Sequence, residues 1–388
     1  MHIHGHRILW TLGRAILNEG PECAMDAATT KGFDRLVCGR TDSSRTLRLA
    51  RRLISLLQVL ALAWSLCAGA LSNFALAETE PKGPPKRALH TVWVGGKLRQ
   101  FTVYLPNQAN CLAASGAEEG SHLLPVVFAF HGVLMNGETM AQMTRLEQTG
   151  NRCGFIVVYP DGDGHGIFRT WNAGGRSGRL ERVAEDDVAF FRCMVDEVQR
   201  QYPVDSKRIH ATGFSNGAML CYRLAAETSD LIASIGPVAG TLAVAVPSTA
   251  RPVPAIHIHG TEDKIVPWNG PNKRTPKNLD FMSVPETISA WNKQLGGGEA
   301  AENGLAVDCE TECCVDRIAD GTRIEIDRFY RGGDSSEREL VYQFVRVVGG
   351  GHAWPGGWNR EWIVGRSSEE LIANEVLWEF FKQHPQGY

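Results

Sequence analysis

Five short, continuous apolar runs constrain the fold more than any other feature of this chain. They lie at residues 124–132, 155–163, 208–215, 232–240 and 253–263. A continuous apolar run of this length is typical of a strand that is buried on both faces of a parallel sheet. Amphipathic helical patterns lie among and after these runs, at residues 185–202, 216–227 and 284–296. Strands that alternate with helices predict an α/β fold with a doubly wound, mostly parallel sheet.

Two features complete this outline. Residues 91–106 alternate apolar and polar side chains around Gly95-Gly96, which predicts a β-hairpin ahead of the first buried run. Near the other end, Ser367 and Glu370 have the spacing of a capping box, which predicts the start of the final helix. No internal repeat and no long linker interrupt the chain, so we expect a single domain.

The first 77 residues differ from the rest. Arg48, Arg51 and Arg52 precede an apolar stretch that ends in small residues at Ala75-Leu76-Ala77, which is the layout of a secretory signal. Polar residues break the stretch, which favours cleavage over a retained membrane helix. We therefore predict a disordered, over-extended N-terminus at 1–47, a signal peptide at 48–77 and a folded domain at 78–388. This predicts a secreted protein, extracellular or periplasmic, without a stable membrane anchor.

The composition and charge of the chain narrow the range of expected binding partners. The formal net charge is −3 and no strong basic block is present, so nucleic acid is a poor candidate partner. The oligomeric state is not predicted. Seven cysteines follow the signal, and export favours disulfides among them, although an odd number leaves at least one thiol without a partner inside the chain. The cluster Cys309-x3-Cys313-Cys314 fits a disulfide loop better than a zinc site, because no second compact ligand pair lies nearby.

A serine lies where the third buried run meets a helical pattern. In Gly213-Phe214-Ser215-Asn216-Gly217, the two glycines permit the sharp strand-to-helix turn that holds a nucleophilic serine out of the sheet. The N–H of Asn216, at the helix start, would then point at developing negative charge. We predict Ser215 as a nucleophile and Asn216 as part of an oxyanion hole.

A serine hydroxyl needs a general base, and histidine has a suitable pKa. His131 and His352 compete for this role. In folds with such a turn the acid and then the base follow the serine along the chain, which favours His352, on a glycine-rich loop. His131 instead opens a loop, residues 132–134, whose N–H groups, Val133 among them, are predicted to help hold the oxyanion.

An acid must orient that base. Asp263 lies at the end of the fifth buried run, and Glu262 beside it is the fallback. Asp186 and Asp187 are rivals, but they precede a helical pattern, so helix N-capping explains them better.

Other residues near these loops have ordinary interpretations. His257 and His259 lie two apart on one strand, and packing explains them better than half of a metal site, so no metal is predicted. Trp171, Trp268, Trp291 and Trp354 are mostly explained by core or rim packing. Trp354 is the best candidate to line a substrate pocket, with Trp171 and His131 as further candidates.

Six segments occur in a characteristic order: HG at 131–132, WNAGG at 171–175, EDDVAFF at 185–191, GFSNGAM at 213–219, HGTEDKIVP at 259–267 and GGGHAWPGG at 349–357. Together, over about residues 88–385, they resemble the secreted polyhydroxybutyrate depolymerase family of esterases, which is close to the feruloyl and acetylxylan esterases of carbohydrate esterase family 1. The resemblance implies an α/β-hydrolase fold for the catalytic domain 78–388. It also implies Ser215 as nucleophile, Asp263 as acid and His352 as base, and no cofactor.

The chain departs from the family at some points. Gly174-Gly175-Arg176 stands where many relatives have cysteines, and the usual late cysteine near residues 330–334 is absent, so the Cys309 region is expected to pair within its own cluster. No binding segment or Ser/Thr/Pro-rich segment follows the catalytic domain, which favours soluble esters over crystalline polyester.

The expected function is a secreted serine carboxylesterase for short-chain, hydroxyalkanoate, feruloyl or acetyl esters. Its substrate would be an ester on plant polysaccharide or a polyester oligomer. The alternative is a non-catalytic surface protein that binds glycan or polymer through the aromatic-rich rim.

Overall fold

The computed structural model describes residues 83–107, 123–174, 186–246, 250–273, 275, 280–296, 307–332, 338–359 and 364–387. All of them belong to one compact unit, Thr79–Tyr388. The predicted N-terminus at 1–47 and signal peptide at 48–77 lie outside the described residues. Among the helices that the structure describes, none combines the length and apolar character that crossing a membrane requires.

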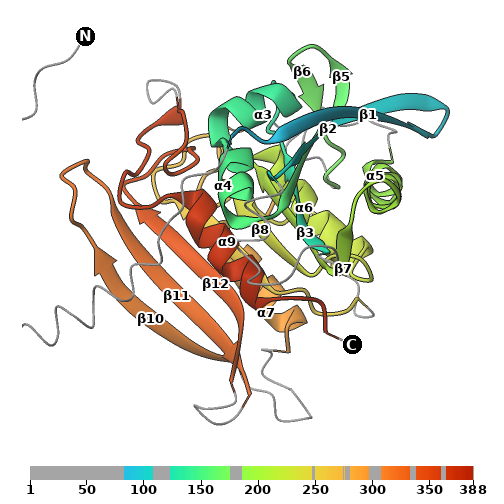
Figure 1. The fold of residues 1–388 in the computed structure, drawn as a ribbon. Coiled ribbons are helices and arrows are strands. Elements are labelled where there is room, and N and C mark those ends of the chain that lie inside the picture. The colour runs from blue at the N-terminus through green and yellow to red at the C-terminus, as the bar shows by residue number, and fades with distance from the viewer. Residues whose placement is uncertain are drawn as a thin grey trace, which may run out of the picture. The chain divides into compact units, whose positions relative to one another are not determined.

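Ten of the described strands form one sheet, in the order β1-β2-β4-β3-β7-β8-β9-β12-β11-β10 (Figure 1). The six central strands, from β4 to β12, run parallel, and antiparallel strands extend both edges. The α/β-hydrolase architecture with a mostly parallel sheet is therefore confirmed. The strands of this sheet are β1 Lys86–Val94, β2 Lys97–Leu105, β3 Leu124–Phe130, β4 Ile156–Pro160, β7 Val204–Phe214, β8 Ser234–Val238, β9 Ala255–Gly260, β10 Val307–Val315, β11 Arg323–Arg331 and β12 Glu339–Val348.

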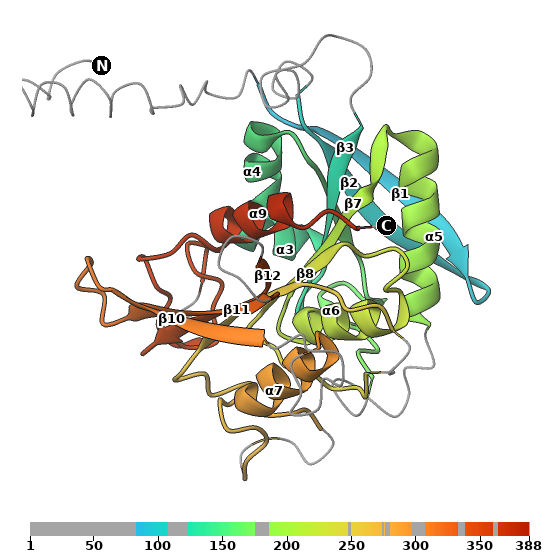
Figure 2. The same cartoon turned by 90° about the horizontal axis from the view of Figure 1, so that it is seen from below.

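Helices cover both faces of the sheet (Figure 2). Side chains of α5 (Asp187–Gln201), α6 (Asn216–Glu227) and α7 (Val284–Gln294) join one apolar core. Side chains of α3 (Gly137–Thr144), α4 (Leu146–Cys153) and α9 (Ala373–Gln383) join the other. Along β3, Phe128 and Phe130 face the first core while Val127 and Ala129 face the second. A strand that is buried on both faces must be apolar at every position, which explains the continuous runs in the sequence.

The edges of the sheet separate correct predictions from incorrect ones. The predicted hairpin is present as β1 and β2, which turn at Gly95-Gly96 with positive φ angles of 57° and 80°. The antiparallel pair β10–β11 was not predicted, because edge strands need no continuous apolar run. A second, two-stranded sheet pairs β5 (Asp163–His165) with β6 (Phe168–Thr170).

The predicted capping box is wrong. The final helix α9 begins after Ile372, which makes no side-chain cap. The Ser367 hydroxyl instead donates to the carbonyl of Trp354, and the Glu370 carboxylate accepts the N–H groups of Arg317 and Ile318. Tertiary partners therefore displaced the local interaction that the spacing predicted.

Candidate active site

Ser215 occupies the turn between β7 and α6. Its φ of 57° and ψ of −118° are rare for a residue with a side chain, and its N–H donates to the carbonyl of Val238 on β8 at 2.9 Å. A strained residue at a strand-to-helix junction is the geometry of a nucleophile elbow, which lifts the hydroxyl above the sheet edge. Ser215 is half-buried, whereas its neighbours Phe214 and Asn216 are buried.

The two flanking glycines explain why this turn is possible. A Cβ atom on Gly213 would lie 2.4 Å from the carbonyl carbon of Gly217. A Cβ atom on Gly217 would lie 2.2 Å from the carbonyl oxygen of Phe130 on β3. Neither position has room for a side chain, so the Gly-x-Ser-x-Gly pattern is a packing requirement here as well as a conformational one.

Asp263 and His352 form a buried pair. The imidazole Nδ1–H of His352 donates to Asp263 Oδ2 at 2.7 Å, and the two side chains are 4% and 0% exposed. The other carboxylate oxygen accepts the N–H groups of Ile265 and Val266, each at 2.8 Å. Burial raises the pKa of Asp263, but the nearby His352 and these hydrogen bonds outweigh it and leave that pKa below its ordinary value. The carboxylate is therefore ionised at neutral pH and holds His352 in one orientation.

The pair lies beside the elbow. The ring of His352 contacts the ring of Phe214, the residue before Ser215, at a centroid distance of 4.7 Å. The structure thus brings the elbow and the Asp263–His352 pair together. Glu262, the fallback acid, turns away, since its exposed carboxylate lies 3.8 Å from Arg366.

The loop after β3 also borders the serine. A Cβ atom on Gly132 would lie 3.3 Å from Ser215 Cβ, so this backbone passes directly against the elbow. Leu134 has a positive φ of 61°, and its N–H donates to the carbonyl of Arg169 at 3.2 Å. Val133 is exposed between these two residues. This position suits the predicted oxyanion loop, while the role of Val133 stays a prediction.

Three residues predicted to bind substrate are interior residues instead. His131 is buried, donates from Nδ1 to the carbonyl of Gly132 at 2.7 Å and accepts the N–H of Gly162 at 2.9 Å. Burial lowers the pKa of His131 to about 4, so the ring is neutral. The indole N–H groups of Trp171 and Trp354, both buried, bind the carbonyl of His131 and the side chain of Asn374. Their polar atoms are used inside the protein, where they fix the loops around the serine.

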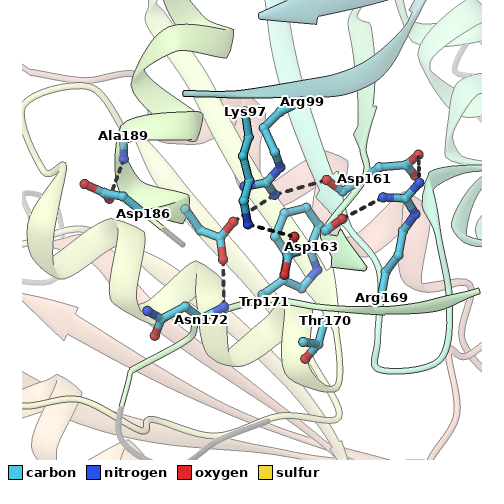
Figure 3. A network of polar contacts seen from close by, with 12 residues as sticks. Lys97, Arg99, Asp161, Asp163, Arg169, Thr170, Trp171, Asn172, Asp186 and Ala189 are labelled. Atoms are coloured by element: carbon cyan, nitrogen blue, oxygen red, sulfur yellow. Dashed lines mark hydrogen bonds and ion pairs between the residues drawn. The ribbon is translucent and has the colours of Figure 1, made fainter. Parts of the chain in front are cut away.

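The segment at 170–172 anchors Asn216. The side-chain oxygen of Asn216 accepts the N–H of Trp171 at 2.8 Å and the hydroxyl of Thr170 at 3.1 Å. The following N–H, of Asn172, donates to Asp187 Oδ2 at 2.7 Å (Figure 3). Asn216, the residue after Ser215, is therefore fixed by its side chain as well as by the helix that it begins.

Asp187 belongs to a buried ion pair that the sequence did not reveal. Arg99 on β2 donates to Asp187 Oδ1 at 2.9 Å, and both side chains are at most 5% exposed. The N-capping interpretation holds only for Asp186, whose carboxylate accepts the N–H of Ala189 at 2.8 Å (Figure 3). The sequence did contain a signal for the burial of Arg99. Arg99 is two positions from the buried Phe101 and therefore lies on the same face of the strand, whereas Leu98 lies on the other face and is exposed.

The structure also bears on the predictions for the cysteines and for the His257–His259 pair. Cys153, Cys193 and Cys221 are free thiols. Cys111 and the side chains of the Cys309–Cys314 cluster lie outside the described residues, so the disulfide prediction is untested. Within the described residues, no group of three or more His, Cys, Asp or Glu side chains could hold a metal ion. His257 and His259 are buried, and their rings bind each other.

Residues 112–253 match the family model described as Esterase PHB depolymerase. Over these residues the chain is similar to the domain of this esterase family. The match contains Ser215 but ends before Asp263 and His352. The resemblance inferred from the six segments is confirmed.

Individual relatives agree with this assignment. NocK of Nocardia uniformis subsp. tsuyamanensis, named as an esterase, is 27% identical over 80% of this chain and 87% of its own length. Feruloyl esterase B of Piromyces equi is 28% identical, and the match covers 58% of this chain and 42% of that protein. Poly(3-hydroxyalkanoate) depolymerase C of Paucimonas lemoignei is 28% identical over 30% of this chain and 28% of its own length. The chain thus spans less than half of these last two relatives.

Among solved structures, the acetyl xylan esterase from Aspergillus awamori is similar at 18% identity, with a TM-score of 0.45 over 69% of this chain and 94% of that chain. The fold assignment rests on the strand order and the elbow rather than on this likeness.

Proposed function

We propose that this chain is a secreted serine carboxylesterase that acts through an acyl-enzyme. The observation that carries the proposal is the 2.7 Å hydrogen bond between the buried Asp263 and His352, next to a strained serine elbow. A buried, ionised carboxylate on Nδ1 leaves the Nε2 of His352 as the proton acceptor. Similarity to this esterase family supports ester hydrolysis as the reaction.

In the acylation half, Ser215 Oγ attacks the carbonyl carbon of the ester while His352 Nε2 takes the hydroxyl proton. The carbonyl oxygen gains negative charge as the tetrahedral intermediate forms. When the bond between that carbon and the alcohol oxygen breaks, His352 gives its proton to the departing alcohol. Ser215 is left as an acyl ester, its hydroxyl proton has left with the alcohol, and His352 is neutral again.

In the deacylation half, a water molecule takes the place of the alcohol. His352 removes one of its protons as the water oxygen attacks the acyl carbon, and then returns that proton to Ser215 Oγ. The products are a carboxylic acid and the restored serine. Through both halves Asp263 keeps the imidazole oriented and stabilises its charged form without taking the proton.

The developing oxyanion needs N–H donors, and we assign them to the backbone of Asn216 and Val133. Asn216 begins α6, so its N–H adds to the positive end of the helix dipole. The loop with Val133 runs directly against Ser215. One such donor typically contributes roughly 3 kcal/mol to the stability of the transition state.

The names of the relatives support a proposal for the class of ester that this chain hydrolyses. Relatives are named for feruloyl esters, acetylated xylan and poly(3-hydroxyalkanoate). We infer that the acyl group is short, aromatic or a 3-hydroxyalkanoate unit. The expectation that soluble esters react faster than solid polyester stays a prediction. Rates on methyl ferulate, acetylated xylan, 3-hydroxybutyrate oligomer and polymer granules decide it, and fastest turnover on granules would refute it.

The decisive experiment compares the wild type with Ser215→Ala on p-nitrophenyl acetate and methyl ferulate. Loss of the nucleophile in such a triad costs on the order of 10⁶ in kcat. A fluorophosphonate probe should label the wild type and leave Ser215→Ala unlabelled. Unchanged turnover in the variant would reject Ser215 as the nucleophile. A folded wild type that takes no label would favour the binding protein instead, although burial of Trp171 and Trp354 weakens that alternative.

A further inference from the structure

A line of buried polar side chains runs from Asp263 into the core. His259 Nε2 lies 3.5 Å from Asp263 Oδ2 and 3.0 Å from the carbonyl oxygen of Val266. His259 Nδ1 lies 3.3 Å from His257 Nε2. The Nδ1 atom of His257 in turn lies 3.1 Å from the hydroxyl of Tyr222. The two histidines come from β9 and the tyrosine from α6.

A second tyrosine completes the far end of this line. The Tyr342 hydroxyl, on β12, lies 3.4 Å from His257 Nδ1 and 3.5 Å from the hydroxyl of Tyr222. All four side chains are at most 1% exposed. The proposed triad uses none of them. Such a set of polar groups in the interior is costly unless every member is hydrogen-bonded.

The partners fix where each proton lies. His259 Nε2 faces two acceptors, the carbonyl of Val266 and the carboxylate of Asp263, so it carries the hydrogen. Its Nδ1 is then an acceptor and takes the Nε2–H of His257. The Nδ1 of His257 is likewise an acceptor and receives a tyrosine hydroxyl. The hydrogen bonds of the line therefore donate in one direction, from the tyrosine hydroxyls to His259, whose N–H donates to the Val266 carbonyl beside Asp263.

Both rings are neutral under ordinary conditions. Burial lowers the pKa of His257 well below its ordinary value, and neighbouring His259 lowers it further. Burial also lowers the pKa of His259, although the Asp263 charge opposes this change. The line thus presents an oriented N–H to the carboxylate without adding a net charge.

Other charged groups near Asp263 have partners elsewhere or face solvent. Arg346, the strand neighbour of His259, binds Glu325 at 2.6 Å and Asp327 at 3.0 Å. Glu262 and Arg366 lie 3.8 Å apart on the surface, and Lys264 is exposed. Apart from His352, His259 is the titratable side chain closest to the Asp263 carboxylate among the described contacts.

We propose that His259 is a positioning residue for the triad: oriented by His257 and the two tyrosine hydroxyls, it donates to the Val266 carbonyl, thereby holds the Asp263 loop, and places its N–H 3.5 Å from the carboxylate oxygen that His352 uses. This rests on the proposed function. Asp263 Oδ2 accepts the His352 N–H at 2.7 Å, and the His259 N–H, which donates to the Val266 carbonyl at 3.0 Å, lies 3.5 Å from the same carboxylate oxygen. The positive end of this N–H dipole partly offsets the negative charge, so the carboxylate draws less strongly on the His352 proton.

Loss of the His259 side chain has two consequences. The Val266 carbonyl loses the His259 N–H, which loosens the loop that aims Asp263. The carboxylate charge also becomes more concentrated, so that charged His352 is favoured. Outer partners that orient an imidazole in metal sites are worth about 10- to 100-fold in activity. We expect the lower end of this range here, because the contact with Asp263 is long.

The test uses the full chain with His259→Leu, His259→Gln and the matched control His210→Leu. His210 is an equally buried histidine on β7 that binds Ser234 and has no contact with Asp263. For a soluble ester, His259→Leu should lower kcat about tenfold, with a smaller change in KM, and move the acid limb of kcat/KM to higher pH. His259→Gln, which keeps an N–H donor, should recover most of both effects. His210→Leu should lose stability only.

A second measurement does not depend on turnover. The His352 Nδ1 proton, bound to Asp263, should give a downfield proton resonance that moves in His259→Leu and stays in place in His210→Leu. The Tyr222→Phe/Tyr342→Phe double variant should move it in the same direction by a smaller amount, and it serves if His259→Leu does not fold. An unmoved resonance in these variants overturns the positioning role. An inactive wild type with a resonance that responds as expected would instead reject the proposed function alone.

Discussion

A Cβ atom on Gly260 would lie 2.4 Å from the carbonyl oxygen of Gly350. The same Cβ would lie 2.4 Å from the carbonyl oxygen of Gly351, and the N–H of Glu262 donates to the Gly350 carbonyl at 2.8 Å. The end of β9, which leads to Asp263, therefore touches the His352 loop backbone to backbone. Glycine at these positions sets the distance across which Asp263 reaches His352.

Replacement of Gly260 by alanine tests this contact. We expect Gly260→Ala to lower the free energy of unfolding by about 1–3 kcal/mol, as overpacked sites do. Activity should fall further than stability explains, because the added methyl group forces the two loops apart. Gly387→Ala is the control, since a Cβ there meets nothing within 4 Å. Thermal unfolding and kcat are the measurements, and matching values for the two variants would contradict the contact.

Two adjacent aspartates should differ in their contributions to stability. Asp187→Ala leaves the Arg99 guanidinium buried without its carboxylate, which typically costs about 3–5 kcal/mol. Asp186→Ala removes only the helix cap, which is worth about 1 kcal/mol. Urea unfolding of both variants measures the difference. Equal losses would show that the buried ion pair does not anchor α5 to β2.

Acid should destabilise the protein partly through His210. Burial lowers the pKa of His210 to about 3, with smaller contributions from His384 and Arg208. At pH values between its ordinary pKa of about 6.5 and this value, His210 is protonated in the unfolded chain and neutral in the folded chain. Stability is therefore lost as the pH falls through this window, and the loss stops growing below the folded pKa.

The variant His210→Leu removes this difference in proton binding between the folded and unfolded chains. We expect it to reduce the slope of unfolding free energy against pH by up to about 1.4 kcal/mol per pH unit between roughly pH 4 and 6. It should be less stable than the wild type near pH 7, because the contact with Ser234 is lost. Urea titrations at several pH values measure the slope. Parallel curves for the two proteins would assign the acid sensitivity to other groups.

Export gives a prediction at the N-terminus. The layout of residues 48–77 predicts cleavage after Ala77. N-terminal sequencing of the protein recovered outside the cell should then begin near Glu78. An intact N-terminus on cytosolic protein would reject secretion, and with it the case for disulfides.

The sequence by itself determined the features that depend on neighbours along the chain. Continuous apolar runs indicated strands buried on both faces, and the strand, turn and helix around Ser215 were readable because glycine spacing is a local requirement. Asp263 and His352 were predicted from chain order, and they lie together because the parallel strands deliver their ends to one edge of the sheet. The boundaries of the elements and the polar edge strands were harder to predict from the sequence, since β10 and β11 lack continuous apolar runs.

Only the tertiary structure decided which side chains face which. Trp171 and Trp354 lie in loops beside the serine, yet their indole N–H groups find partners in the interior, which no spacing reveals. Arg99 and Asp187 are 88 positions apart and meet because β2 lies beside α5. His259 reaches Asp263 because the chain turns back after β9. Chain order brings residues to the same edge of the sheet, whereas burial and hydrogen-bond partners, which depend on distant segments, decide what each residue does there.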